Sequence, residues 1–270
     1  MEPSSFPELY QHLFPSEILK FHLPETKATC DRCAMQPGRT RTKITYRSDL
    51  KCCTYEPFLP NFYVGALLSS KLTSDLGRKT LVEKIEKRKY ALPIGMVAAV
   101  RFQIEFNQRR VGEFGNREDW LCPYYNRAQQ NCGIHQYRGS VCISFFCKSV
   151  AGRPGLSYWQ QVQNYLSYVE MALLEEALVQ LDFSPRQMSD LLDYVNRSEG
   201  TAAERKTWSL PEAKARKLWN GYYDEQENFY KKCYQFVLSL TKKQFREALG
   251  EQGQQLQETL LKTQQRLEIK

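Results

Sequence analysis

Eight of the nine cysteines fall between residues 30 and 147 of the 270-residue chain. They are Cys30, Cys33, Cys52, Cys53, Cys122, Cys132, Cys142 and Cys147. The first four are arranged as C-x2-C and, after eighteen intervening residues, an adjacent pair; the last four are separated by nine, nine and four residues. Zinc and iron–sulfur sites both commonly take four cysteine thiolates. The eight residues therefore predict two four-thiolate metal sites, or one such site with additional thiols.

The adjacent pair Cys52 and Cys53 favours a cluster over a single ion. In an extended backbone neighbouring side chains point to opposite faces, so that one mononuclear ion would hardly be reached by both thiols. Adjacent cysteines and long intervals also differ from zinc-finger spacing. We therefore prefer an iron–sulfur cluster as the cofactor, with zinc as the alternative. For any single cysteine, the structural alternative is a small buried hydrophobic residue.

The rest of the chain indicates a reducing compartment. It begins MEPSSFPELY, without the basic and then apolar segments of a signal peptide. No stretch reaches the roughly 18 consecutive apolar residues of a membrane-spanning helix. We therefore expect a cytoplasmic protein without membrane association, in which dense cysteines bind metal more often than they form disulfides. A secreted disulfide framework is the alternative.

The residues next to the cysteines resemble those of a known family. Pro-Tyr-Tyr follows Cys122, Gly-Ile-His follows Cys132, Arg-Gly-Ser-Val precedes Cys142, and a phenylalanine precedes Cys147. This order is similar to the YkgJ-like cysteine-cluster family, whose members are described as zinc- or iron-chelating proteins. The resemblance covers about residues 30–147, and it implies metal binding by the eight cysteines without a defined reaction.

Three features depart from that family's usual pattern: the long interval after Cys33, His135 where tyrosine is common, and Gly139 in place of a proline. One branch of the family is similar to the flagellin lysine methylases. That branch implies an alternative function, an enzyme that modifies a protein or peptide with the metal in a structural or redox role. Whether the chain is an enzyme stays open, because no G-x-G turn, G-x-x-x-x-G-K-[ST] loop or G-x-S-x-G motif is present.

The histidines and the isolated cysteine add little chemistry of their own. None of the three histidines lies in the H-E-x-x-H motif of zinc proteases. His135, three residues after Cys132, is a candidate fourth metal ligand, a hydrogen-bond donor to a thiolate, or a plain surface residue. Cys233 lies in an apolar helical pattern, so we expect it in the core.

Basic residues are in excess only in the half that carries the cysteines. The formal net charge is +8, and residues 1–150 hold 22 basic against 14 acidic side chains. A third alternative, a zinc-stabilised module that binds nucleic acid or an acidic partner, is suggested by the basic run between residues 78 and 89 and by the basic residues Arg39, Arg41, Lys43 and Arg47. A solvated helix face, or cations that offset thiolate charge, explains the same residues, and we prefer this explanation to nucleic-acid binding.

The elements that must position the cysteines are predicted to be mostly α-helical. Hydrophobic residues make up 42% of the chain and charged residues 25%, as is typical of globular proteins. We predict an N-terminal lead-in (1–25) and an irregular cysteine-rich metal-binding module (26–150) packed against a helical C-terminal domain (151–270). Within the module, residues 74–90 have helical periodicity, whereas 94–106 fit either a strand pair or a helix.

Helical periodicity is clearest in the C-terminal domain. An apolar stripe predicts a helix over about 157–181; it consists of Trp159, Val162, Leu166, Val169 and Leu173. Ser184 and Pro185 have the residue types of a helix start, and that helix is expected to reach about residue 196. A third helix is predicted from 209–211 to about 249. The Gln-rich tail, 251–267, is either a frayed helix or a helix that binds a protein partner.

Overall fold

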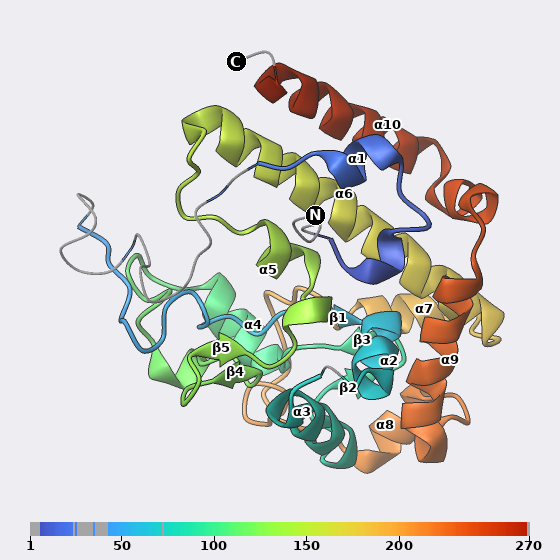
Figure 1. Cartoon of the computed structure of the whole chain (residues 1–270). Helices are drawn as coiled ribbons and strands as arrows, with labels where there is room; N and C mark the ends of the chain where they lie inside the picture. Colours follow the sequence, from blue (N-terminus) through green and yellow to red (C-terminus); the bar gives the residue numbers. More distant parts are fainter. Residues whose placement is uncertain (1–5, 24, 26–34, 36–42, 72, 269–270) are drawn as a thin grey trace.

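The computed structural model describes residues 6–23, 25, 35, 43–71 and 73–268. Within them the chain is mostly helical, as predicted (Figure 1). The helices are α1 (Ser16–Lys20), α2 (Asn61–Ser69), α3 (Asp75–Glu86), α4 (Val100–Asn107), α5 (Ser140–Ser144), α6 (Gly152–Gln180), α7 (Pro185–Leu192), α8 (Glu212–Leu218), α9 (Gln226–Ser239) and α10 (Lys242–Glu268). No helix in this part of the chain is both long and apolar enough to span a bilayer.

Helix α2 lies at the centre of the molecule. Its residues 61–68 are all buried, and a helix that is apolar on nearly every face is stable only when other elements surround it. Asn61, at its first turn, is fully buried and donates hydrogen bonds to the carbonyl oxygens of Pro93 and Leu174. This side chain therefore connects the start of α2 to the turn at Pro93 and to α6.

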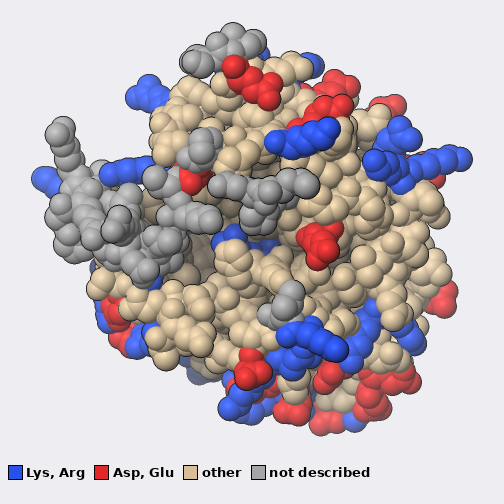
Figure 2. All heavy atoms as spheres, in the orientation of Figure 1, with Lys and Arg blue, Asp and Glu red and all other residues tan. Residues whose placement is uncertain are grey.

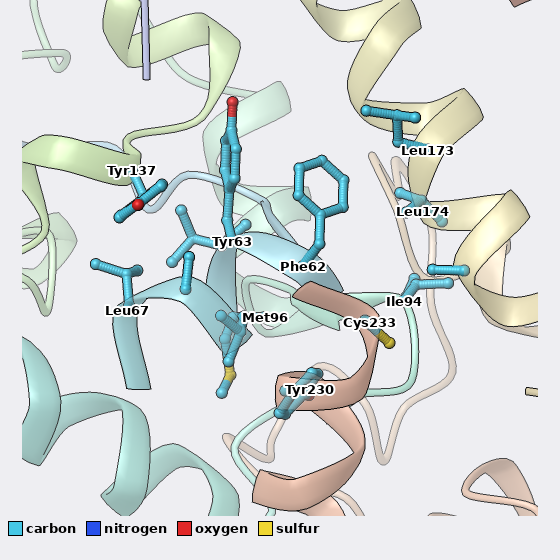
Figure 3. Packing of buried hydrophobic residues seen from close by; sticks show 14 of the residues in the cluster. Phe62, Tyr63, Leu67, Ile94, Met96, Tyr137, Leu173, Leu174, Tyr230 and Cys233 are labelled. Carbon is cyan, nitrogen blue, oxygen red and sulfur yellow. The ribbon is translucent and has the colours of Figure 1, made fainter. Parts of the chain in front are cut away.

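Helix α9 packs directly on α2 because a glycine lies at the crossing point. A Cβ atom on Gly65 would stand 1.9 Å from the carbonyl oxygen of Tyr230 in α9. Figure 3 shows the surrounding core, in which Phe62 of α2 lies towards Leu173 and Leu174 of α6. The absence of a side chain at position 65 thus allows the two backbones to approach closely.

The long helix α6 carries the predicted stripe, and all five of its residues are buried. Helix α10 lies alongside α6, as seen at the top of Figure 1, and Leu260 of α10 is fully buried. The segment predicted to be a frayed or partner-binding tail is therefore a helix that packs on its own chain. Helix α10 bends at Gly250, whose φ of 57° is outside the helical region.

The lead-in packs onto the helices through the 3-10 turn Glu8–Tyr10 and α1. Tyr10 and Phe14 are buried and their rings stack at 4.5 Å between centroids. One hydrophobic cluster extends from these residues through α2 and α6 to Leu260, so that the two predicted domains share a core.

In the part of the chain that the structure describes, the strands form two small antiparallel sheets. The first has the order β1 (Leu59–Pro60), β3 (Gly95–Met96), β2 (Ala91–Leu92), and the second pairs β4 (Tyr125–Asn126) with β5 (Asn131–Cys132). The ambiguous segment 94–106 is neither a strand pair nor a single helix: β3 occupies its start and α4 its end.

The predicted helix starts are largely confirmed. Ser74 accepts a hydrogen bond from the Gly77 N–H at the start of α3. Ser184 and Gln187 form a reciprocal capping box at the start of α7, where Pro185 is the first residue. Helix α7 ends at Leu192, a few residues before the predicted end.

The prediction of one helix from 209–211 to about 249 is wrong. The chain forms α8, a 3-10 turn (Tyr223–Glu225), α9 and the start of α10 in this range. Asn220 and Gly221 have positive φ values of 44° and 88°, which end α8. Thr241 then starts α10 with a second reciprocal cap, because its hydroxyl accepts from the Gln244 N–H and the Gln244 side chain accepts from the Thr241 N–H.

Candidate metal centre

The predicted ligands come from separate segments with little regular structure. Cys52 and Cys53 follow a turn, Cys122 follows the 3-10 turn Glu118–Trp120, Cys132 ends β5, and Cys142 lies in α5. Cys147 lies beyond α5 and is half-buried. Cys30 and Cys33 lie outside the described residues. Cys52, Cys53, Cys122 and Cys142 are present as free thiols in the structure.

The turn before Cys52 is held by buried contacts. Lys51 has a φ of 58°, and its N–H donates to the carbonyl oxygen of Arg47 at 2.8 Å. The Lys51 side chain is 1% exposed, and its ammonium group donates to the side-chain oxygen of Gln130 at 3.3 Å. Because Gln130 lies between β4 and β5, this bond joins the segment of Cys52 and Cys53 to the hairpin that carries Cys132.

A backbone hydrogen bond brings the second cysteine segment to the first. The N–H of Cys122 donates to the carbonyl oxygen of Cys53 at 2.8 Å. The hairpin begins three residues later, and in it Tyr125 pairs with Cys132. Cys122 and Cys132 are therefore held near Cys53 by backbone geometry, with Cys122 buried.

Helix α5 carries Cys142 and is anchored by α6. The buried carboxyl group of Glu170 in α6 accepts a hydrogen bond from the Ser140 N–H at 2.8 Å, and the hydroxyl groups of Ser140 and Ser167 lie 2.8 Å apart. Arg138, just before α5, has a buried Nε atom with no hydrogen-bond partner among the described residues. Helix α5 and the segment just before it thus place Cys142 and the Arg138 guanidinium group near each other.

The thiols and Arg138 are close enough to influence one another's ionisation. The adjacent Cys53 thiol and burial raise the pKa of Cys52, whereas Arg138 lowers it. Burial and the nearby Cys142 raise the pKa of Cys122. Burial and Cys132 raise the pKa of Cys142 to about 12, with Arg138 again acting in the opposite direction.

These effects define a cysteine group that we call the thiol cluster: Cys52, Cys53, Cys122, Cys132 and Cys142. Within this cluster, Cys142 and Cys132 both raise the pKa of Cys122. Cys132 and Cys52 both raise the pKa of Cys142. Within the described part of the chain, however, no three His, Cys, Asp or Glu side chains stand close enough together to hold one metal ion. The thiols therefore share a region without forming a compact single-ion site.

The other residues singled out from the sequence lie around or away from the thiol cluster. His135 lies in the 3-10 turn His135–Tyr137, where partial burial and the Arg138 charge lower its pKa. Phe146, before Cys147, packs on Trp159 with ring centroids 4.3 Å apart. Cys233 is fully buried in α9, as predicted, within the core shown in Figure 3.

Sequence reasoning missed three charged residues near the thiols: Lys51, Arg138 and Glu170. Lys51 is buried because it adopts a left-handed backbone conformation and bonds to Gln130, which is far away in the sequence. Neither feature can be recognised from the residues next to Lys51. Glu170 was detectable, since it lies four residues after Leu166 and three before Leu173, on the apolar face of α6. An acid in such a position is a sign of a buried, hydrogen-bonded carboxyl group.

Comparison of the chain with protein-family models, with curated proteins and with solved structures finds no match. The function must therefore be argued from the site.

The raised pKa values determine the protonation state of the thiols when no metal is bound. Nucleophilic cysteines have lowered pKa values, because the thiolate is the reactive form. Cys52, Cys122 and Cys142 have raised pKa values, so they are protonated at neutral pH. Metal binding displaces such protons, and thiolate ligands then become stable in a buried site. In the metal-free protein these thiols are therefore poorly suited to nucleophilic catalysis.

Proposed function

We propose that the protein binds a metal centre through the thiol cluster together with Cys147, Cys30 and Cys33. The observation that carries this proposal is the convergence of five cysteines from four segments of the chain, one buried and the others half-buried. The donor chemistry fits a thiolate-bound metal, since zinc and iron–sulfur centres both take cysteine ligands. The unpartnered Nε of Arg138 adds a cation that would offset the charge of bound thiolates.

An iron–sulfur cluster is the preferred cofactor. A single zinc ion requires four ligands around one point, whereas a cluster distributes its thiolates over separate iron atoms. The thiols share a region without surrounding one point, so they are better suited to an iron–sulfur cluster than to a single zinc ion. When bound, such a cluster supplies electron transfer or structural stabilisation, and the buried aromatic side chains of Tyr124 and Tyr125 limit its contact with water.

Purification without oxygen, followed by a visible spectrum and by iron, zinc and sulfide analysis, tests the proposal. We expect a brown protein with iron and acid-labile sulfide in similar amounts. A colourless protein with stoichiometric zinc would support the metal centre and overturn the choice of cofactor. A folded protein that contains neither metal, and takes up neither on reconstitution, would refute the proposed function.

The charge distribution argues against the alternative of a nucleic-acid-binding module. Five of the six basic residues between 78 and 89 already bind acceptors in the protein; they are Arg78, Lys84, Lys87, Arg88 and Lys89. On the face shown in Figure 2, basic and acidic side chains lie among one another. Cations that are already paired contribute less to phosphate binding, which depends on free Lys and Arg charge.

A further inference from the structure

Three of the large apolar side chains that are exposed in the structure lie on segments that contact one another. They are Ile44, Val111 and Phe145, which are 40%, 87% and 43% exposed. The ring of Phe145 packs on Phe114 with centroids 5.7 Å apart, and Phe114 packs on Tyr46 at 5.4 Å. Single apolar residues scattered over a surface are ordinary, whereas a group of them on adjoining segments marks an interaction site.

The turn after α4, which carries Val111, is held in a fixed position. The side-chain amide of Asn116 donates to the carbonyl oxygen of Gly112 within the turn, at 2.8 Å, and to that of Thr45, at 2.7 Å. The segment that contains Ile44 therefore lies beside the turn. Because the turn is ordered by the protein's own hydrogen bonds, a partner can bind it with little further loss of conformational entropy.

Val111 protrudes from the surface. Its side chain is 87% exposed, and a Cβ atom on the next residue, Gly112, would have no heavy atom beyond the adjacent residues within 4 Å. A protruding apolar side chain offers no groove that could enclose a peptide chain. A lipid bilayer accommodates such a shape, because apolar side chains enter the boundary between the headgroups and the acyl chains.

The two arginines that directly precede the protruding valine have no acidic partner among the described residues. Nη1 of Arg109 donates to the carbonyl oxygen of Phe106 at 2.8 Å, and the guanidinium group lies 4.3 Å from the centroid of the Phe106 ring. This contact fixes the guanidinium group and leaves its other N–H groups for an external acceptor. Glu113, the acid next to Arg110, accepts the backbone N–H of Arg110 and pairs with Arg117. Two guanidinium charges are thus available to an anion.

We propose that this surface binds the anionic face of a lipid bilayer. Val111 enters the bilayer between the headgroups, Phe145 lies at headgroup level, and Arg109 and Arg110 bind the phosphate or carboxylate groups of the lipids. The exposed Lys43 adds a third positive charge. Burial of apolar area and attraction to anionic lipids both contribute to such binding.

This proposal corrects the expectation that the protein does not associate with membranes. That expectation was based on the lack of a spanning segment, and binding to the surface of a bilayer requires none. The inference is independent of the proposed metal centre, because none of the residues that would contact lipid is a predicted metal ligand.

Co-sedimentation of the purified protein with sucrose-loaded vesicles tests the proposal. One set of vesicles contains phosphatidylcholine with about 30% phosphatidylserine, and the matched set contains phosphatidylcholine alone. At about 1 mM lipid and about 0.05 M salt, we expect half or more of the protein to sediment with the anionic vesicles and little with the neutral ones. Raising the salt to about 0.5 M should release most of the bound protein.

Variants determine whether the binding occurs at this surface. Val111→Ser should weaken binding to the anionic vesicles about fivefold or more, because it removes the inserted apolar side chain. Arg109→Gln combined with Arg110→Gln should weaken it about tenfold or more. Val111→Trp should strengthen binding, since tryptophan favours the membrane interface. All three positions are exposed, and circular dichroism verifies that each variant folds.

Two controls make matched changes on other elements of the protein. Val179→Ser replaces a 54% exposed valine of α6, and Lys79→Gln combined with Lys206→Gln removes two exposed cations. Both controls should bind the anionic vesicles nearly as wild type does. The proposal is overturned if the anionic vesicles do not retain the protein, if Val111→Ser binds them as tightly as wild type, or if the lysine variant loses as much binding as the arginine variant. Tighter binding to soluble poly-L-glutamate than to the vesicles would also overturn it, and would assign the surface to an acidic protein partner.

Discussion

Glu170 offers the most quantitative test of the structure. Its side chain is 3% exposed within the apolar face of α6, and it accepts the Ser140 N–H at the start of α5. Burial raises the pKa of Glu170 from 4.5 to about 8, although hydrogen bonds to Ser140 and Tyr63 act in the opposite direction. The carboxyl group is therefore protonated in the folded protein at neutral pH and ionised in the unfolded chain.

The sign of the pH dependence follows from this difference. Between pH values of about 4.5 and 8, the folded state holds a proton that the unfolded state releases, so folding becomes less favourable as the pH rises. A shift of about 3.5 pKa units corresponds to about 5 kcal/mol above both pKa values, and to about 3 kcal/mol at pH 7. Glu170→Gln removes the ionisation but keeps an oxygen that accepts the Ser140 N–H. We therefore expect the variant to be more stable than wild type, by an amount that grows with pH.

Urea unfolding followed by circular dichroism, at pH values from about 5 to about 8.5, measures this difference. Glu176→Gln, at an exposed position on the same helix, is the control and should show no such trend. Other titrating groups affect wild type and variant alike, so they cancel in the comparison. A stability difference between Glu170→Gln and wild type that stays constant with pH, or that decreases as the pH rises, would refute the raised pKa.

Three further changes test the packing, the caps and the thiols. Gly65→Ala places a methyl group against the Tyr230 carbonyl oxygen and should destabilise the protein by about 3 kcal/mol in urea unfolding, whereas Ser69→Ala at the exposed end of α2 should have little effect. Ser184→Ala removes the capping box of α7 and should cost about 1 kcal/mol, seen as a lower Tm; an unchanged Tm would contradict the capping role. Cys122→Ser and Cys142→Ser should lose most of the bound iron or zinc by elemental analysis, and Cys233→Ala should retain it, because Cys233 is buried in α9 away from the thiol cluster. Full metal content in both serine variants would show that these cysteines are not ligands.

The parts of the fold that sequence reasoning predicted are those whose cause is local. The apolar stripe of α6 and the Ser184 cap each depend on residues within a few positions of one another. The break between α8 and α9 depends on Asn220 and Gly221 adopting positive φ, and the apolar pattern continues across it without interruption. Periodicity alone therefore merged separate helices into one.

The candidate site was predictable in residue type but not in arrangement. Spacing divided the cysteines into two groups, whereas Cys52 of the first group influences Cys142 of the second. It also suggested opposite directions for Cys52 and Cys53 in an extended backbone. The structure places this pair after a left-handed turn at Lys51, where the two thiols influence each other. The bond from the Cys122 N–H to the Cys53 carbonyl oxygen spans almost seventy positions of sequence, and no local pattern encodes it.

The distribution of regular structure suggests where a metal would act. Helices α2, α6, α9 and α10 supply most of a continuous hydrophobic core, which Cys122, Tyr124 and Ile143 join from the thiol region. The thiol cluster lies on turns, a two-residue ribbon and the five-residue α5, and none of its members is part of a long helix. Metal binding contributes most to stability where the chain alone contributes least. If the proposed metal is bound, its removal should loosen residues 43–58 and 118–147 first, while the helical core retains its circular dichroism signal, and hydrogen exchange can distinguish the two regions.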